Sequence, residues 1–387
     1  MSRTSANAKV LVLGSGITVL GVLRALADAK IRAIVPPDVD ELPRRSRWCK
    51  PGLPSLGGLT PERLPFALKS LPPSTVLIPC SDIWAKALAA LPLEIRARYP
   101  AIVADSEALN VLIDKARFRD VLGRLGLPHP TTRVLSTRAD LDLVPDSVLT
   151  TSFLKPVNSQ QFFSHFGVKG FRIAGRADAS ANFKRGTDAG FEMLLQDYIP
   201  GPPTNHFFID GFVDRNGVVR ARFARRRLRM NPPDFGNSTL MVSVPLEDVT
   251  GGAETLDALF ADLQYRGIYS AEFKRDERDG EFKLLEVNAR PWWYVEFAAR
   301  CGVNVCALAV RDALGEPVET ISEYAVGRRC VYPYYDIGAI RAERAAGRVG
   351  SFEWVRAWVG PYQPVFRWSD PGPALGEVAA VMRRRLP

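Results

Sequence analysis

A glycine turn between two apolar runs near the start of the chain limits most strongly what this sequence can fold into. Residues 9–14 read KVLVLG, a short β-branched run, and a Gly-Ser-Gly turn leads from it into the apolar helix pattern of residues 19–29. A second run, IRAIVP, follows at residues 31–36. A strand, a helix and another strand in this order predict a βαβ unit and hence a parallel α/β sheet.

The spacing of the glycines argues against a dinucleotide site. Gly14, Gly16 and Gly21 form G-x-G-x-x-x-x-G, whereas dinucleotide-binding turns have G-x-G-x-x-G. Pro36 and Pro37 follow the second strand, at the place where an acidic residue would bind a ribose. The turn is therefore expected to allow close packing of the strand against the helix.

The order of apolar runs indicates an α/β part followed by an α+β part. Strands at residues 74–82 and 101–105, with a helix between them, complete the first part, and Asp82 ends the former at its carboxyl edge. One helical stretch is expected over residues 106–128, with Ser106 as its N-cap. Further strands are expected near residues 132–136, 152–157, 169–175, 193–199, 206–213, 218–224, 239–244, 267–275 and 281–288, and helices near 138–142, 180–187, 251–264, 295–313 and 374–386.

Composition favours a globular protein with an anionic partner. The 387 residues are 24% charged and 47% hydrophobic, and 51 Lys and Arg against 42 Asp and Glu give a net charge of +9. This charge favours nucleotides, phosphates, acidic substrates or nucleic acid. Five scattered cysteines and three histidines indicate neither a disulfide framework nor a Cys/His zinc site. Because the chain lacks an apolar run of about 20 residues, we expect no membrane span and a cytoplasmic location.

Two runs near residue 280 bring acidic and amide side chains to one face of a sheet. YSAEFKRD and FKLLEVNAR are joined by ERDG, which predicts a hairpin. Because side chains alternate along a strand, Glu272, Glu286 and Asn288 are expected to share a face. Two carboxylates and an amide on apolar strands suit Mg²⁺ bound together with substrate phosphates. The alternative is a solvated face with salt bridges to Lys274 and Lys283.

Several cationic residues accompany this hairpin. Arg290 continues the face of Asn288 and can hold a phosphate or carboxylate bidentately. Lys155 closes an apolar strand, where a buried ammonium needs an anion such as a triphosphate. Lys115 either binds an anion or is an exposed helical lysine. Lys169 lies between two glycines, in either a phosphate-binding loop or a hairpin strand.

Two further segments suit a nucleotide. MLLQDYIPGPP (193–203) is an apolar strand that runs into a Pro/Gly turn, and the backbone at such a strand end can pair with adenine. RARFARRRLRM (220–230) holds six arginines; on a strand, Arg225, Arg227 and Arg229 share one face. The run suits phosphate or carboxylate binding in a cleft, nucleic-acid binding or a solvated strand. Since few aromatic residues interleave with the arginines, nucleic acid is disfavoured.

Taken in order, these segments resemble the ATP-grasp superfamily over residues 8–320. Within it the chain is most similar to carboxylate–amine ligases of the kind that includes D-aspartate ligase and the carbamoyl-phosphate synthase large subunit. The segments that carry the resemblance are DK (114–115), GLPHPTT (126–132), LKP (154–156), QDYIPG (196–201), AEFKRD (271–276) and LLEVNARP (284–291), with SRWC (46–49), LIPCSD (77–82), RMNPPDFGNST (229–239) and DALGEP (312–317) typical of the subgroup.

The resemblance implies an ATP-grasp fold that combines α/β and α+β parts. An N-terminal, Rossmann-like pre-ATP-grasp domain (1–108) would precede an ATP-grasp domain (109–320). The latter would have two lobes that clamp ATP, with a hinge near residues 196–201. Residues 321–387 would form a small C-terminal extension.

The resemblance also implies a role for each candidate residue. The ATP-binding residues would be Lys115, Lys155 and Lys169 at the phosphates, the backbone of Gln196, Asp197, Tyr198 and Ile199 at adenine, and Thr204 at the ribose. One or two Mg²⁺ ions, with Mn²⁺ as a substitute, would be bound by Glu272, Glu286 and Asn288. The catalytic residues would be Arg290 with Arg227 or Arg229, which would hold a carboxylate and then its acyl phosphate.

The implied activity is the ATP-dependent joining of a small carboxylate to an amine, both amino-acid-like, with release of ADP and phosphate. The resemblance also implies a homodimer. An ATP-grasp carboxylase or another acyl-phosphate ligase is the enzymatic alternative. A nucleotide- or RNA-binding protein without ligase activity is the non-enzymatic one. Trp292 and Trp293 either shape an acceptor pocket or simply pack.

Overall fold

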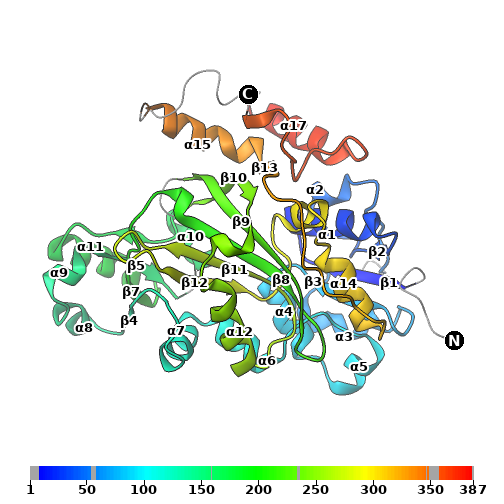
Figure 1. The fold of residues 1–387 in the computed structure, drawn as a ribbon, viewed down its shortest axis with the longest axis horizontal. Helices are drawn as coiled ribbons and strands as arrows, with labels where there is room; N and C mark the ends of the chain where they lie inside the picture. The colour runs from blue at the N-terminus through cyan, green and yellow to red at the C-terminus, as the bar shows by residue number, and fades with distance from the viewer. Residues whose placement is uncertain are drawn as a thin grey trace.

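Three sheets organise the chain (Figure 1). The computed structural model describes residues 8–53, 58–157, 159–232, 236–345, 347 and 357–385. Asn158, between the strands expected near residues 152–157 and 169–175, and residues 233–235, within the RMNPPDFGNST segment, lie outside the described residues. The same holds for residue 386, where the last predicted helix was expected to end. In the described part of the chain, no helix is long and apolar enough to span a membrane.

The N-terminal sheet is parallel and confirms the predicted βαβ unit. Its strands are β1 (Lys9–Leu13), β2 (Arg32–Ile34) and β3 (Val76–Pro79), in the order β2-β1-β3. The helices of this region are α1 (Gly16–Asp28), α2 (Glu41–Arg44), α3 (Leu64–Leu68), α4 (Asp82–Ala89) and α5 (Leu93–Arg98), with the 3-10 turn η2 (Pro61–Arg63). Gly14 allows the close packing expected of the turn, because a Cβ there would lie 2.9 Å from Cys80 Cβ.

Three expectations for residues 101–128 were wrong. Residues 101–105 make only one bridge, between Ala101 and Leu77, because Asp105 turns the chain to cap the next helix. The N-cap is therefore Asp105 and not Ser106. The expected single helix is two, α6 (Ser106–Ile113) and α7 (Lys115–Arg124). Asp114 separates them, since its backbone is extended and its side chain accepts from two amides of α7.

A four-stranded antiparallel sheet follows. Its order is β4 (Thr132–Leu135), β7 (Met193–Asp197), β5 (Ser152–Pro156) and β6 (Phe171–Arg172), and its helices are α8 (Arg138–Asp142), α9 (Asp146–Leu149), α10 (Ser159–Phe166) and α11 (Arg176–Asp188). Helix α10 lies between the strands expected near residues 152–157 and 169–175, where no helix was predicted. Phe162 and Phe166, four residues apart, pack with Phe171 and supply the apolar face that this helix needs.

A six-stranded antiparallel sheet forms the centre of the molecule. Its order is β12 (Phe282–Asn288), β11 (Gly267–Arg275), β8 (His206–Val213), β9 (Val219–Asn231), β10 (Asn237–Ser243) and β13 (Arg329–Val331). The turns η3 (Pro203–Asn205) and η4 (Leu246–Asp248) flank it. Side chains alternate along β8: Phe208 and Phe212 pack with the N-terminal sheet, whereas Phe207 and Ile209 pack with α6, α7 and α12 (Gly252–Asp262).

The helix expected at residues 295–313 is two helices. They are α13 (Val295–Arg300) and α14 (Val305–Ala313). Gly302, with a φ of 110°, lies between them in a conformation that favours glycine, and Asn304 caps α14. The expectation of one continuous helix was therefore wrong.

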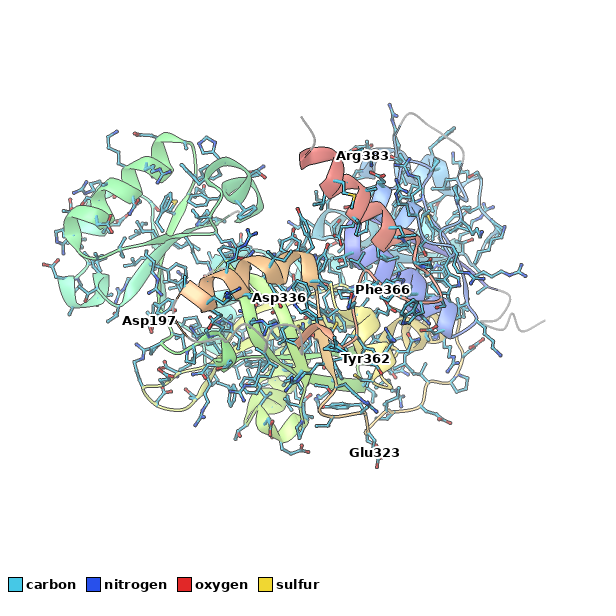
Figure 2. All side chains as sticks on the ribbon, turned by 90° about the horizontal axis from the view of Figure 1, so that it is seen from above. Asp197, Glu323, Asp336, Tyr362, Phe366 and Arg383 are labelled. Carbon is cyan, nitrogen blue, oxygen red and sulfur yellow. The ribbon has the colours of Figure 1, made fainter. Side chains whose placement is uncertain are left out.

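The C-terminal residues join the central sheet rather than standing apart from it. Strand β13 pairs with β10, while α15 (Pro333–Ala345) packs on β9 and α17 (Gly372–Arg385) packs on α2. Figure 2 shows Asp336, which belongs to α15, above the central sheet.

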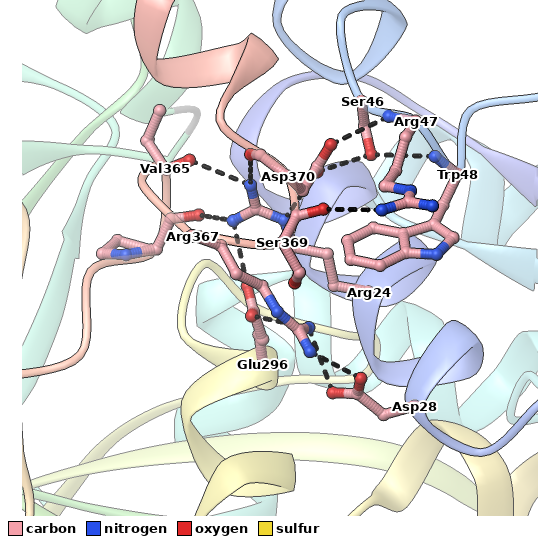
Figure 3. Close-up of polar contacts among 11 residues, drawn as sticks. Arg24, Asp28, Ser46, Arg47, Trp48, Glu296, Val365, Arg367, Ser369 and Asp370 are labelled. Carbon is pink, nitrogen blue, oxygen red and sulfur yellow. Dashed lines mark hydrogen bonds and ion pairs between the residues drawn. The ribbon is translucent and has the colours of Figure 1, made fainter.

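A fully buried arginine ties this C-terminal segment to the rest of the chain (Figure 3). Arg24 of α1 donates to Asp370 Oδ2 at 3.0 Å and to Glu296 Oε2 of α13 at 3.3 Å. It also donates to the carbonyl oxygens of Pro364, Val365 and Asp370. One guanidinium thus joins α1, α13 and residues 364–370.

Candidate active site

The hairpin of β11 and β12 places two carboxylates opposite each other. Glu272 pairs in register with Glu286, and Ser270 pairs with Asn288. The expectation that the two glutamates and Asn288 share a face is confirmed. A bulge follows Glu272, so the register changes just beyond the glutamate pair.

Glu272 is contacted by an arginine from β9 and a histidine from β8. Arg227 Nη2 donates to Glu272 Oε1 at 3.0 Å, and His206 Nδ1 lies 2.7 Å from the same oxygen. Burial alone would raise the pKa of Glu272, but Arg227 and His206 lower it far below its usual range. Burial also lowers the pKa of His206 to about 4, so this imidazole is neutral at neutral pH.

The alternative was that Lys274 and Lys283 form salt bridges with the hairpin face, and their described contacts are different. Lys274 lies over the ring of Tyr198, 4.6 Å from its centroid, and Lys283 pairs with Glu281 and Asp279 in the hairpin turn. Glu286 is exposed and accepts from Asn288 Nδ2 at 3.2 Å. The two glutamates therefore have no lysine bridge between them in the described part of the chain.

The donor set of the hairpin fits a magnesium ion. Both described partners of Glu272 bond to Oε1, and the described contact of Glu286 is also to Oε1. The Oε2 atoms of both residues are thus available for a cation, which would offset the repulsion between two facing carboxylates. The described residues contain no cluster of three or more His, Cys, Asp or Glu that could hold a metal, so the donor set here is two carboxylates and an amide.

Two lysines from other elements reach the same place. Lys155 Nζ on β5 donates to Gln196 Oε1 at 3.0 Å, and Lys115 Nζ donates to the carbonyl oxygens of Pro156 and Val157 at 2.9 and 2.8 Å. Burial lowers the pKa of Lys155, opposed by the charges of Glu286 and Glu272. Burial and then Lys155 lower the pKa of Lys115 to about 7, opposed by Glu286. The charges of the hairpin carboxylates thus act on both lysines. Because burial disfavours their charged forms, an additional anion between the two lysines would be stabilising.

The other ATP-binding candidates lie along the border of the two antiparallel sheets. Lys169 spans that border, with its Nζ donating to Asn237 Oδ1 at 2.8 Å. Asp197, labelled in Figure 2, pairs with Arg278 at 2.7 Å. Ile199 is buried, and Thr204 lies in η3, where its carbonyl oxygen accepts from Arg226 Nε at 2.6 Å.

The arginines of β9 take the faces that were expected, and each has an internal partner. Arg225, Arg227 and Arg229 lie on one face, and the carboxylates they meet are those of Asp210, Glu272 and Asp336. Asp210 and Asp336 are fully buried. Burial raises the pKa of Asp210, opposed by Arg225. The charge of the arginine run is therefore largely compensated inside the protein.

Arg290 connects the hairpin to the N-terminal sheet. Its Nε donates to Asp82 Oδ1 at 2.7 Å, and its Nη2 donates to Asn288 Oδ1 at 3.1 Å. The structure thus brings Arg290 together with the hairpin face. Trp292 packs in the core beside Phe208, and Trp293 packs against Tyr335 of α15.

Three residues at this site were missed as site residues from the sequence. Asp82 could have been identified from the sequence, since it ends a strand at the carboxyl edge of the N-terminal sheet, where ligands bind. His206 had a weak signal, as one of only three histidines in the chain. Asp336 had none, because its partner Arg229 is 107 residues away.

Comparisons with known proteins show which fold this chain has. No family model matches it. Its structure is similar to the L-amino acid ligase of Bacillus licheniformis, with a TM-score of 0.58, 18% identity and coverage of 82% of this chain and 76% of that one. It is also similar to the biotin carboxylase domain of the Hydrogenobacter thermophilus 2-oxoglutarate carboxylase, solved with MgADP, ADP and bicarbonate (TM-score 0.62, 18% identity, 83% and 73% coverage).

These likenesses confirm that the chain has the ATP-grasp fold. A curated sequence relative is the D-aspartate ligase of Enterococcus faecium (strain Aus0004), 27% identical over 247 residues. The match includes 61% of this chain, and the chain spans 58% of the length of that relative.

Proposed function

We propose that the protein is an ATP-dependent carboxylate–amine ligase that forms an amide through an acyl phosphate and releases ADP and phosphate. The observation that carries this proposal is the facing pair of Glu272 and Glu286, with Lys155, Lys115 and Arg290 around it. A metal site bordered by lysines and a carboxylate-binding arginine suits phosphoryl transfer from ATP to a carboxylate.

We assign metal binding and phosphate binding to different residues of this site. Glu272, Glu286 and Asn288 would hold one or two Mg²⁺ ions, with Mn²⁺ as a substitute, and Lys115, Lys155 and Lys169 would contact the phosphates. When bound, Mg²⁺ neutralises phosphate charge and so lowers the repulsion that an attacking carboxylate meets. His206 and Arg227 keep Glu272 ionised and oriented as a ligand.

Adenine would bind at the end of β7. The amides of Asp197 and Tyr198 already donate to the carbonyl oxygens of Thr131 and Thr151. The amide of Ile199, for which the described residues show no such partner, is therefore the donor we assign to adenine, with the backbone of Gln196 beside it. Thr204 would lie near the ribose.

The arginines would act in the carboxylate half of the site. Arg290 would bind the carboxylate and then the acyl phosphate, because it borders both the hairpin and open solvent. Arg227 or Arg229 would support it, although Arg229 is already bound by the buried Asp336. The carboxylate oxygen attacks the γ-phosphorus, ADP leaves, and the amine then displaces phosphate and loses a proton. Positioning supplies most of the catalysis.

Two alternatives make different predictions. A carboxylase would use bicarbonate, which the Hydrogenobacter domain binds, as its carboxylate. A nucleotide- or RNA-binding protein would turn over no ATP. The internal pairing of Arg225, Arg227 and Arg229 disfavours RNA, because paired guanidiniums release few counterions.

The test is release of ADP from Mg²⁺ and ATP with amino acids and small carboxylates supplied in pairs, D-aspartate included. We expect turnover only when a carboxylate and an amine are both present, with an amide as the product. Turnover with bicarbonate alone would favour the carboxylase. Binding of ATP without turnover of any pair would favour the non-enzymatic alternative.

The assembly and the division of the chain are part of the proposal. We expect a cytoplasmic homodimer, to be checked by light scattering of the purified protein. We also propose that the chain divides into residues 1–108, 109–320 and 321–387, and that the two lobes of residues 109–320 move about a hinge near residues 196–201. Limited proteolysis with and without ATP tests this division.

A further inference from the structure

Asp82 occupies the binding edge of the arginine that we assign to the carboxylate. It is the first residue of α4, directly after β3, so it projects from the carboxyl edge of the N-terminal sheet. Its Oδ1 accepts from Arg290 Nε at 2.7 Å, and its Oδ2 lies 3.5 Å from Arg290 Nη2. The contact joins residues that are 208 positions apart.

The other donors of Arg290 are already directed within the protein. Nη1 donates to the carbonyl oxygen of Pro291 at 3.2 Å, and Nη2 donates to Asn288 Oδ1 at 3.1 Å. The Nε–Nη2 edge, which can bind a carboxylate with two parallel hydrogen bonds, is the one that Asp82 holds. A substrate carboxylate that binds this edge must therefore replace Asp82.

The pair between Asp82 and Arg290 is suited to exchange, unlike the neighbouring pairs. The side chain of Asp82 is 46% exposed, whereas those of Asp210 and Asp336 are fully buried against Arg225 and Arg229. An exposed carboxylate regains hydration when it leaves its partner. A buried carboxylate would leave an unpaired charge in the protein interior.

On the basis of the proposed function, we infer that Asp82 selects an amino acid as the carboxylate substrate. The substrate carboxylate takes the Nε–Nη2 edge of Arg290, and Asp82 turns to the substrate ammonium group. The physical reason is charge. A displaced Asp82 stays beside the incoming carboxylate, and two adjacent anions repel each other unless a cation lies between them. An amino acid carries that cation, whereas a simple carboxylic acid does not.

The experiment compares D-aspartate with succinate, which differ only in the ammonium group. ADP release by the full-length protein is measured with each acid at saturating ATP, Mg²⁺ and amine. If the pairing screen identifies a different amino acid, that amino acid and its analogue without the amino group form the pair. We expect kcat/KM of the wild-type protein to favour the amino acid by at least about tenfold, as one charged hydrogen bond would provide.

The variant Asp82→Asn removes the charge and keeps the shape. We expect it to lower kcat/KM for the amino acid by at least about tenfold, mainly through KM, while the value for succinate changes by less than about threefold. The preference for the amino acid is then lost. Asp82→Glu keeps the charge and should retain the preference, which also covers the case in which Asp82→Asn folds poorly.

Asp142→Asn is the matched control. Asp142 is also a partly exposed partner of an arginine, Arg138, but it lies on α8, away from the hairpin. We expect neither kinetic constant to change in this variant.

The outcomes separate the two proposals. Absence of ADP release with every carboxylate and amine would overturn the proposed function, and this inference with it. Turnover in which the wild-type protein uses succinate as well as the amino acid would overturn the inference alone. The same holds if Asp82→Asn lowers kcat/KM for both acids by the same factor, because Asp82 would then only position Arg290.

Discussion

The Arg24 cluster and the candidate active site use the same side-chain chemistry for different ends. In the Arg24 cluster, Arg24, Glu296 and Asp370 have side chains that are at most 4% exposed. Asp370 also accepts from Ser46 Oγ and from the amide of Arg47. At the hairpin, by contrast, Glu286 is exposed and both glutamates retain an unengaged Oε2 among the described contacts.

The two regions differ in how many of their charged groups already have hydrogen-bonding partners. Arg24 donates to five acceptors from two segments, so a ligand would find little left to bind. The hairpin brings Glu272 and Glu286 together with one described ion pair, from Arg227 to Glu272, and it faces lysines whose pKa values are lowered. A saturated cluster stabilises the fold, whereas an unsaturated one is suited to bind a ligand. Four predictions test this contrast.

The largest effect is expected at the hairpin. Glu286→Gln keeps the shape but removes a proposed metal ligand, so ADP release should fall by at least about 100-fold. Because Glu286 is exposed, the free energy of unfolding should change by less than about 0.5 kcal/mol. Steady-state kinetics and urea unfolding measure the two quantities.

Glu281→Gln on the same hairpin is the control, because Glu281 pairs with Lys283 in the turn. It should leave ADP release unchanged. Wild-type activity in Glu286→Gln would remove the distinction between the two clusters.

The next effect is expected in the Arg24 cluster and concerns stability. Arg24→Met leaves Glu296 and Asp370 buried without their shared cation, which should cost about 3–5 kcal/mol of unfolding free energy. Urea unfolding of the variant measures this cost. Adding Glu296→Gln and Asp370→Asn should restore part of the loss. A change below about 1 kcal/mol would mean that the cluster is not a structural one.

Lys115 should give the candidate site a pH dependence. Its folded-state pKa is about 7, against 10.5 for an ordinary lysine. Below about pH 7 both the folded and the unfolded chain hold the proton, so the burial penalty is fully present. Between pH 7 and 10.5 only the unfolded chain holds it, so the penalty fades as pH rises. Lys115→Met should therefore be more stable than the wild type at pH 6.5 and lose this advantage toward pH 10.

The affinity for ATP should depend on whether Lys115 is protonated. Protonated Lys115 attracts phosphate, so the KM for ATP should rise by up to about tenfold per pH unit above pH 7. Lys115→Arg stays charged and should abolish this rise. An equal rise in both proteins would assign the pH dependence to another group.

The smallest effect is expected at the rim of the Arg24 cluster. Arg367 pairs with Asp28 at 2.7 Å, and the two side chains are 18% and 37% exposed. Arg367 also pairs with Glu296 at 3.3 Å, but Glu296 keeps Arg24 as a partner. Arg367→Gln should lower the unfolding free energy by no more than about 1 kcal/mol. Urea unfolding at low and high salt measures the loss, which salt should reduce. A loss equal to that of Arg24→Met would show that burial does not separate the two arginines.

Local pattern was enough to predict the elements that carry the candidate site. The strand predicted near residues 267–275 has the bounds of β11 in the structure, and alternation along this strand and the next put Glu272, Glu286 and Asn288 on one face. The ordered motifs predicted the ATP-grasp fold. The break at Asp114 was missed because periodicity continues through it, although a side chain there caps a new helix.

Partners far apart in the chain could not be predicted. Asp82 meets Arg290, Arg229 meets Asp336, and Arg24 meets Asp370 across 208, 107 and 346 positions. The basic run seemed available for anions, yet the fold supplies an acid for each of Arg225, Arg227 and Arg229. The net charge of +9 therefore says less about partners than the few cations that remain near the hairpin.

The sequence by itself determined the order of strands and helices, the hairpin face and the class of fold, because alternation, turns and caps act over a few residues. Only the tertiary structure decided which charges are satisfied. An ion pair depends on the distance and burial of two side chains, and sheet packing sets both. Whether an arginine is held by buried carboxylates, as Arg24 is, or by a partly exposed one, as Arg290 is, is thus a property of its surroundings and not of the residue type.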